Sequence, residues 1–372
     1  MKELLRKLLR FWRIYKNRMS YYRLYSQMME KNSIPQKCAD GEKEWLRFWR
    51  TYDKNIKPYA YRVFSRYVGI NMDILPLEVF ANVVEPVMMP QKFVEYYGDK
   101  NMLPRLVESE HLPITYLRNV NGTYYTDKYE VIQEDDLLQL LVNIPINSII
   151  VKPSLEGSGR GVDMFYRNDT NEWINQRQKK LTLDYLKQAY KKNYLIQEKA
   201  AQSNYLAQFN ATSVNTIRMA VYRNEKNDVE ILGAVLRIGA TGSIMDNAHQ
   251  GGVFCGIDDN GVLGKYVCNY LGVRYEVFND IDFANNVYKI PNYEQVKFFA
   301  KNVIKAVLHH NIIALDIYMD VDNYPKLIEL NVGSFGAWPF QFAGTPTLGK
   351  YTHEIMERCR NNYTIGGFTI NI

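Results

Sequence analysis

Residues 324–336 read YPKLIELNVGSFG, and the interpretation of the whole chain starts from this stretch. Its apolar residues predict a β-strand, on which residues i and i+2 point to the same side. Glu329 and Asn331 would then present two hard oxygen donors side by side, while Ile328 and Leu330 face the other way. Because a buried carboxylate is costly unless it is paired or bound to a cation, this pattern suggests a metal site.

The preceding apolar run, IIALDIYM at residues 312–319, carries Asp316 in its middle. Asp316 lies thirteen residues before Glu329, so the two runs can pair as a hairpin with a turn near residues 322–324. That pairing would bring three oxygen ligands together, and Mg²⁺ favours one or two carboxylates plus the phosphates of a nucleotide. The alternative is a pair of acids on the solvent face of an edge hairpin, which suits Asp320 and Asp322 better than Asp316.

A second informative stretch is IIVKPSLEGSGRGV, residues 149–162. The predicted strand delivers Lys152, a point charge that suits a phosphate group. The loop that follows is rich in glycine and serine, so its backbone N–H groups can approach phosphates without obstruction from side chains. The lysine precedes the glycines and no GK[ST] follows, so this is not a Walker P-loop. An ordinary flexible hairpin would have a similar composition, and that alternative stays open.

The composition fits a soluble globular protein of two or three domains, with 372 residues, 47% of them hydrophobic and 23% charged. A formal charge of +6 fits anionic ligands and does not require nucleic acid. The four cysteines are scattered without a CxxC pair, so neither a zinc site nor a disulfide framework is indicated, and a cytoplasmic setting is expected. No apolar run approaches the roughly 18–20 residues that span a bilayer, and charges interrupt every candidate signal-peptide core.

Residues 1–31 predict a basic amphipathic helix. Its apolar positions at helical spacing are Leu5, Leu8, Leu9, Trp12 and Tyr15, and Arg6, Arg10 and Arg13 fall on another face. One interpretation is a helix packed on its own protein with solvated charges, and the other is docking on a partner such as a glycosyltransferase or on the inner face of a membrane. Residues up to about 98 are mostly helical by pattern, and no GxGxxG supports a dinucleotide-binding domain there.

From about residue 100, short strands rich in Val and Ile alternate with helical stretches expected at 171–192 and 293–310. This pattern predicts an α+β body. In order and spacing, VKPSLEGSGRGV, LIQEKA and ALDIYMDVDNYPKLIELN resemble the ATP-grasp superfamily of carboxylate–amine ligases. YYGDKNMLPRL, VNGTYY, SVNTIRMAVYR and DNAHQGGVFCGIDDNGVL resemble further blocks of the sugar-transfer-associated ATP-grasp proteins, so that the resemblance covers about residues 85–350.

The resemblance implies an ATP-grasp fold, in which two α+β subdomains clasp ATP, here with a helical N-terminal region. The expected divisions are 1–95 for the helical region, 96–200 for the central subdomain with the phosphate-binding lysines, and 201–372 for the C-terminal subdomain with the Mg²⁺ ligands. Many ligases of the superfamily carry an α/β unit at the N-terminus instead. The substrate therefore cannot be transferred from the resemblance.

The same resemblance implies roles for individual residues. Asp316, Glu329 and Asn331 match the Mg²⁺ ligands, and Arg218 and Arg237 fall where basic residues face the phosphates or an acyl phosphate. The residues expected at ATP are Lys100 and Lys152 for the phosphates, Ser158 and Gly159 in the closing loop, and Gln197, Glu198, Lys199 and Ala200 at the adenine. No residue is assigned to the ribose.

A dedicated general base is not evident from the pattern. His249, in a glycine-flanked loop, is a candidate because histidine is the commonest general base, although a lone histidine in a loop is more often incidental. The aromatic residues of GSFGAWPFQFAG, residues 333–344, suit either the wall of an acceptor site or the core.

The implied function is an ATP- and Mg²⁺-dependent ligase that forms an amide through an acyl phosphate. Its substrates would be a carboxylate and an amine, with attachment of an amino acid or related group to a sugar or to a surface-polysaccharide precursor such as that of a capsule. A phosphotransferase acting on a sugar or glycan hydroxyl is the alternative, and a non-catalytic docking protein is a third. The carboxylate, the amine and the oligomeric state do not follow from the sequence.

Overall fold

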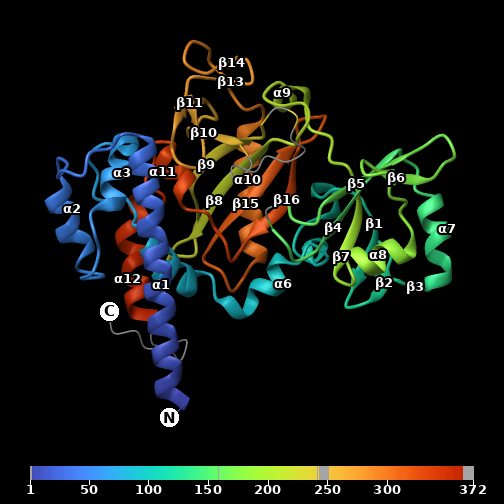
Figure 1. The fold of residues 1–372 in the computed structure, drawn as a ribbon, viewed down its shortest axis with the longest axis horizontal. Coiled ribbons are helices and arrows are strands. Elements are labelled where there is room, and N and C mark those ends of the chain that lie inside the picture. The colour runs from blue at the N-terminus through green and yellow to red at the C-terminus, as the bar shows by residue number, and fades with distance from the viewer. Residues whose placement is uncertain (1, 158, 241, 243–250, 363–372) are drawn as a thin grey trace.

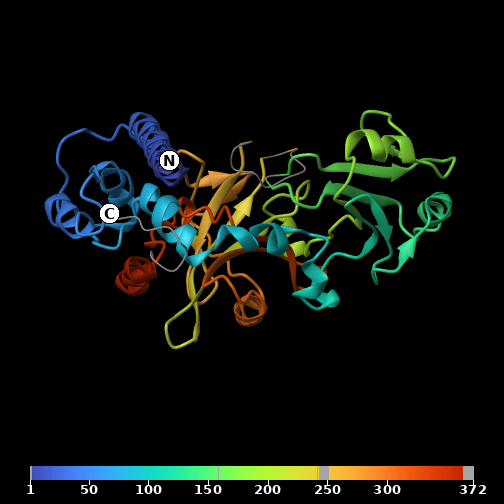
Figure 2. The same ribbon diagram turned by 90° about the horizontal axis from the view of Figure 1, so that it is seen from below.

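The computed structural model describes residues 2–157, 159–240, 242 and 251–362. Three parts follow one another along its longest axis (Figure 1). They are a helical N-terminal region, a β-sheet built mainly from the C-terminal half of the chain (the second sheet), and a β-sheet from the middle of the chain (the first sheet). The view from below shows the same succession (Figure 2). Helices and antiparallel sheets are thus combined as the sequence predicts, and the α+β class is confirmed.

The first sheet has seven antiparallel strands in the order β3-β2-β1-β7-β4-β5-β6. In that order their bounds are Val131–Ile132, Thr123–Tyr125, Thr115–Val120, Tyr194–Glu198, Ser148–Pro153, Asp163–Arg167 and Trp173–Asn175. Helices α7 (Leu137–Val142) and α8 (Leu183–Ala189) pack apolar side chains such as Leu141 and Leu186 into the core of this sheet.

The second sheet also has seven antiparallel strands, in the order β12-β11-β10-β9-β8-β15-β16. In that order their bounds are Arg274–Tyr275, Leu263–Cys268, Val253–Ile257, Val229–Ile238, Thr216–Arg223, Ile312–Met319 and Pro325–Asn331. Strand β15 is buried along its whole length because both faces of the sheet are covered. A continuous apolar strand is what such burial requires, and IIALDIYM supplies it.

Helix α10 (Tyr293–Ala306) covers one face of the second sheet. It buries Val296, Phe299, Ala300 and Val303, whose spacing of three and four residues makes one apolar stripe. The helix predicted at 293–310 is confirmed except for its last turn. The helix predicted at 171–192 is wrong over most of its length. The chain there makes β6 between two turns, in which Asn171 and Gln178 respectively have positive φ, and only α8 is helical.

The N-terminal region covers the other face of the second sheet. Its elements are α1 (Lys2–Lys31), α2 (Glu42–Trp49), α3 (Tyr59–Val68), α4 (Leu77–Val79), the π-helical turn η1 (Phe80–Val84) and α5 (Glu85–Met88). Side chains of this region share one core with alternate residues of the sheet strands, such as Tyr222 and Val235. The side chain of Gln341, in α11 (Trp338–Phe342), also bonds both the N–H and the carbonyl of Leu75, at 2.6 and 3.1 Å. The helices are therefore part of the same packed body as the sheet.

Shorter elements complete the chain. They are η2 (Gln91–Phe93), α6 (Val94–Gly98), η3 (Leu103–Arg105), η4 (Ser109–His111), η5 (Glu134–Asp136), α9 (Asn204–Ala207), β13 (Val277–Phe278), β14 (Ile281–Asp282), η7 (Gly349–Tyr351) and α12 (Thr352–Asn362). Among the described residues, no helix is both long and apolar enough to pass through a bilayer.

Helix α1 has two different halves. Tyr25 and Met28 of its second half are fully buried against the body of the protein. Its first half extends beyond the body (Figure 1), and large apolar side chains such as Phe11 (73% exposed) and Trp12 (60% exposed) face solvent there. The second half thus packs on its own protein, as one interpretation predicts, whereas the first half leaves an apolar face uncovered and docking of that half stays a prediction.

The contact between α1 and α4 contains a buried carboxylate. Tyr25 Oη donates to Glu78 Oε2 at 2.9 Å, and Tyr25 Oη in turn accepts the N–H of Leu77 at 2.7 Å. Burial raises the pKa of Glu78 to about 7, above its ordinary value. The folded chain therefore holds a proton between about pH 4.5 and 7 that the unfolded chain has lost, so this group costs stability as pH rises through that range.

Glu78→Gln removes the ionisation and keeps an oxygen for Tyr25. The variant should be more stable than the parent by about 2–3 kcal/mol at about pH 8, and this advantage should shrink strongly at about pH 5. Urea denaturation at both pH values measures it, with the exposed Glu44→Gln as control. An advantage that is the same at the two pH values would contradict the assignment.

Candidate active site

Three charged residues project from one face of the second sheet. On β8, Ile217, Met219 and Val221 pack on the α10 side, so Arg218 points to the opposite face, which the N-terminal region covers. The strand pairing sets Arg218 beside Asp316 of β15, and Arg237 extends from the neighbouring β9. The period-2 alternation of the strands alone therefore brings these three side chains together.

Asp316 is paired with both arginines. Arg218 donates through Nε and Nη2 to the two carboxylate oxygens at 2.8 and 2.7 Å, and Arg237 Nη1 donates to Oδ2 at 2.7 Å. Only 2% of the Asp316 side chain is exposed. Burial by itself would raise the pKa of this carboxyl, but the Arg218 and Arg237 charges outweigh it and hold the pKa well below its usual range. Asp316 is therefore ionised at neutral pH.

Glu329 and Asn331 lie beside this pair. Strands β15 and β16 form the predicted hairpin, with Asp316 opposite Glu329 and Ala314 opposite Asn331. Arg218 Nη2 donates to Asn331 Oδ1 at 3.3 Å, and Lys100 Nζ lies 3.1 Å from Glu329 Oε2. Two carboxylates and an amide oxygen from neighbouring positions are hard donors suited to Mg²⁺, so the donor set fits this ion.

Lys100 and Lys152 face this hairpin from the side of the first sheet. Burial, together with the neighbouring charge of Lys100, lowers the pKa of Lys152 to about 7, although Glu329 opposes the shift. Two close lysines opposed by a single carboxylate leave the site short of negative charge. Such a pair suits a polyanionic ligand, which would stabilise both charged forms.

The glycine-rich loop is tied to Lys100. The backbone N–H of Lys100 donates to Ser154 O, and its Nζ donates to Glu156 O, both at 2.9 Å. Gly161 has φ +69°, and a Cβ there would come within 2.8 Å of Pro153 Cγ, so only glycine fits this turn.

A cavity of about 170 Å³ lies between the two sheets. The predicted residues that line it are Lys100, Lys152, Gly159, Gln197, Glu198, Ala200, Arg237, Asp316 and Glu329. Lys199 is exposed and is not part of the lining, whereas Gln197 donates to Thr115 Oγ1 at 2.9 Å and Glu198 accepts the N–H of Ile114 at 2.9 Å. The side chains of Gln197 and Glu198 are therefore already engaged, and their backbone is paired with the neighbouring strands of the first sheet.

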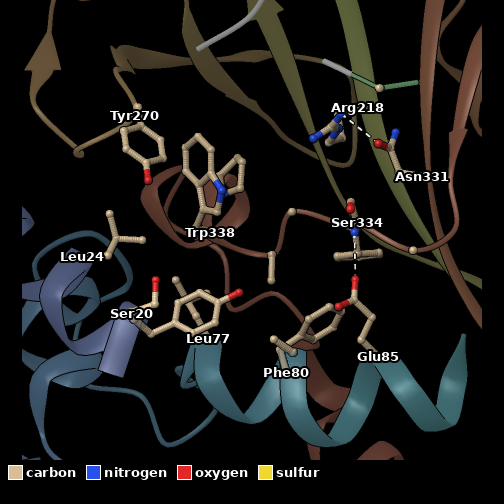
Figure 3. A pocket seen from close by; sticks show the side chains of 18 of the residues that line it. Ser20, Leu24, Leu77, Phe80, Glu85, Arg218, Tyr270, Asn331, Ser334 and Trp338 are labelled. Carbon is tan, nitrogen blue, oxygen red and sulfur yellow. Dashed lines mark hydrogen bonds between the residues drawn. The ribbon is translucent and has the colours of Figure 1, made fainter. Parts of the chain in front are cut away.

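A second cavity, of about 820 Å³, opens beyond the hairpin toward the N-terminal region (Figure 3). Its lining includes Ser20 and Leu24 of α1, Phe80 of η1, Glu85 of α5 and the segment 333–339. Arg237, Glu329, Glu156 and Arg160 line both cavities, so the two meet at the charged hairpin.

The aromatic segment after β16 divides between wall and core. Trp338 is partly exposed and lines the second cavity, whereas Phe335, Phe340 and Phe342 are buried in the core; Phe335 also borders the cavity. The core interpretation is confirmed for these three phenylalanines, and the acceptor wall stays a prediction for Trp338.

Ser158 and His249 lie outside the described residues. Sequence reasoning missed Glu85, Arg160 and the side chains of α1 that line the second cavity. The basic charge of Arg160 inside the glycine-rich loop was a signal that could have found it. No local signal marks Glu85 or the α1 residues, because only the fold brings them to the site.

The chain was compared with known proteins. No curated protein matches it. Among solved structures it is similar to the biotin carboxylase domain of 2-oxoglutarate carboxylase from Hydrogenobacter thermophilus, with 11% identity, a TM-score of 0.40, and coverage of 76% of this chain and 48% of that one. The chain thus spans about half the length of that domain.

Two further similar structures are covered over a larger share of their length. A D-alanine–D-alanine ligase from Bacillus anthracis has 14% identity and a TM-score of 0.36, over 73% of this chain and 70% of that one. A D-cycloserine synthetase has 13% identity and a TM-score of 0.41, over 73% of both chains.

A family model described as sugar-transfer associated ATP-grasp matches residues 81–357, which is more than half of the chain. The matched range contains both sheets, the charged hairpin and the glycine-rich loop. The chain belongs to the sugar-transfer associated ATP-grasp family.

Proposed function

We propose that the protein is an ATP-dependent ligase that activates a carboxylate as an acyl phosphate and joins it to an amine. The observation that carries this proposal is the junction of the two cavities at Arg237 and Glu329. A nucleotide in the smaller cavity would direct its terminal phosphate toward this junction. A substrate in the larger cavity would meet the phosphate there.

The residues that would hold Mg²⁺ are Asp316, Glu329 and Asn331. When bound, the ion would neutralise charge on the phosphates of ATP. Lys100 and Lys152 supply further positive charge from the opposite wall, and Gln197, Glu198 and Ala200 of the lining would contact the adenine. Gly159 belongs to the loop that would close over the phosphates and exclude water, which matters because an acyl phosphate hydrolyses readily.

Arg218 and Arg237 act at the reacting groups. An oxygen of the substrate carboxylate attacks the terminal phosphorus of ATP, and ADP leaves. The amine then attacks the carbonyl carbon, a C–N bond forms, and phosphate leaves with the electrons of the broken C–O bond. The two guanidinium groups stabilise the negative charge that develops on the oxygens during both steps. Their pairing with Asp316 holds them in place without reorganisation.

The substrate is a sugar or a surface-polysaccharide precursor that receives an amino acid or a related group. The sugar-transfer association of the family supports this choice, as does the size of the second cavity with Trp338 in its wall, since sugars stack on aromatic rings. A screen of amino acids and amino sugars for stimulated ADP formation, followed by mass spectrometry of the products, tests it. An amide product supports the ligase, and a phosphomonoester shows a phosphotransferase instead.

The exposed half of α1 docks on an anionic membrane surface. Its uncovered apolar side chains are Leu5, Leu8, Leu9, Phe11, Trp12 and Tyr15. Residues 1–16 carry six lysines and arginines and one acid, so the helix combines an apolar face with positive charge. Peripheral contact at the inner face of a membrane would bring the enzyme to lipid-borne precursors.

Glu329→Gln should weaken the effect of Mg²⁺ on ATP binding, because the substitution removes one anionic ligand. Calorimetry with and without Mg²⁺ should show at least a ~10-fold loss of the Mg²⁺-dependent gain in affinity. Glu294→Gln, at an exposed carboxylate of α10, is the control. An unchanged Mg²⁺ dependence in Glu329→Gln would disprove the metal assignment.

Lys152→Ala should weaken ATP binding by roughly tenfold or more, because a charge-assisted contact to phosphate contributes about 1.5–3 kcal/mol. Lys152→Arg, which keeps the charge, should lose less. Lys187→Ala, which breaks an exposed ion pair with Glu134, should have no effect. Equal affinities in Lys152→Ala and the parent chain would exclude a phosphate-binding role.

Membrane docking predicts that the full chain sediments with vesicles that contain phosphatidylglycerol, and less with pure phosphatidylcholine. High salt and the double variant Phe11→Ser, Trp12→Ser should each release it, because salt screens charge and serine removes apolar area. If the double variant sediments like the parent chain, α1 is not the anchor. Binding to a glycosyltransferase without any binding to vesicles would replace the membrane by a protein partner.

A further inference from the structure

Glu85 is a carboxylate of the second cavity that lacks a positive partner. It begins α5, directly after the π-helical turn η1, and its side chain is partly buried. Its Oε1 accepts the backbone N–H of Phe335 at 3.1 Å. Within the described part of the chain, no lysine, arginine or histidine forms an ion pair with it.

Two other acids near the junction, Asp316 and Glu329, differ from Glu85 in this respect. Asp316 is paired with Arg218 and Arg237, and Glu329 with Lys100. A carboxylate withdrawn from water without a countercharge is costly. Burial accordingly raises the pKa of Glu85 to about 7, although the N–H of Phe335 opposes the shift. Glu85 can therefore gain or lose a proton near neutral pH.

The surroundings of Glu85 come from three segments. Tyr21 of α1 is close enough for the Glu85 charge to add to the effect of burial, and together they raise the pKa of Tyr21 to about 12. The segment 333–337 contributes no titratable side chain. The helix of Glu85 continues with Pro86, which lacks an N–H, and the wider π-helical turn accommodates that loss.

The contacts of the 333–337 segment place Glu85 near the reacting groups. Phe335, whose N–H Glu85 accepts, is four residues beyond Asn331, a length of chain that spans at most about 14 Å. The next residue, Gly336, packs on Arg218, because a Cβ there would lie 3.0 Å from Arg218 Nη1. Figure 3 shows Glu85 on the helix at one side of the cavity, with Arg218 and Asn331 at the other.

We infer that Glu85 binds the ammonium group of the amine substrate and accepts its proton. This inference rests on the proposed ligase function and deepens it by assigning the amine end of the site. The ammonium gives one proton to the Glu85 carboxylate, and the neutral amine attacks the acyl phosphate. The C–N bond forms and the C–O bond to phosphate breaks. The second amine proton leaves with the phosphate, and Glu85 returns its proton to solvent.

The amine is expected to carry an apolar or ring-shaped portion. Trp338 and Tyr270 are partly exposed to the cavity across from Glu85 (Figure 3), and the buried Phe80 and Phe335 border it. Benzylammonium therefore resembles the expected group, and benzyl alcohol is its neutral counterpart.

Ligand-observed NMR titrations at neutral pH test the site with these two probes. Benzylammonium should bind the full chain more tightly than benzyl alcohol does. Glu85→Gln should weaken benzylammonium binding by about tenfold or more, since a charged hydrogen bond contributes about 1.5–3 kcal/mol, and should leave benzyl alcohol binding unchanged. The glutamine keeps an oxygen for the Phe335 N–H, so the segment 333–337 stays in place.

Glu156→Gln is the matched control, because Glu156 is an exposed carboxylate that lines the same cavity. It should leave benzylammonium binding unchanged. The inference is overturned if the parent chain does not prefer benzylammonium, if Glu85→Gln keeps the preference, or if Glu156→Gln loses it. Thermal denaturation of Glu85→Gln checks that the variant is folded.

The probe titrations contain no ATP, so a negative result there overturns the role of Glu85 and leaves the ligase proposal standing. The measurements of ADP formation and of the products decide the ligase proposal. With a substrate pair from the amine screen, Glu85→Gln should lower kcat at least ~10-fold and leave the KM for ATP unchanged. If Glu85 had a purely structural role, Glu85→Gln would keep the preference for benzylammonium over benzyl alcohol. It would also not lower kcat while leaving the KM for ATP unchanged.

Discussion

The fold and the site both depend on one buried carboxylate, Asp316, held between Arg218 and Arg237. The three residues come from β15, β8 and β9, so their contacts fix the order of these strands at the end where the cavities meet. Removing one partner of such a pair leaves a buried charge uncompensated, at a cost of about 3–5 kcal/mol. The neighbouring Lys100 and Lys152 leave the junction with more positive than negative side chains. That excess favours a ligand with several negative charges.

The N-terminal helices close this site from the side that the sheets leave open. They share a core with the second sheet, so the wall of the larger cavity has a fixed position relative to the charged side chains of the strands. The two halves of helix α1 contact different surroundings. A helix of 30 residues is about 45 Å long. Its inner half lines the cavity and its outer half exposes an apolar face, so a surface on which the outer half docks would have a fixed position relative to the cavity.

The features that could be predicted from the sequence are those formed by residues close together along the chain and those marked by an ordered set of sequence blocks. The hairpin of Asp316 and Glu329 followed from thirteen residues of separation, and the family from the order of several blocks; both are confirmed. The pairing of Asp316 with two arginines did not follow, because β8 and β9 lie 98 and 79 residues away along the chain. The helix predicted at 171–192 failed because its charged residues fit a helix as well as the turns they make. Glu85 carries no signal in its own neighbourhood and becomes visible only through its contact with Phe335.

The distribution of charge along the joined cavities suggests how two substrates of opposite charge are kept in order. On the nucleotide side, Lys100 pairs with Glu329, and Arg218 and Arg237 pair with Asp316. On the other side, Glu85 has only a backbone N–H. A polyanion is thus favoured at one end and a cation at the other, and the carbonyl that must react with both lies between them. These fixed charges would orient the two bound substrates before they react, and they need no rearrangement during the reaction.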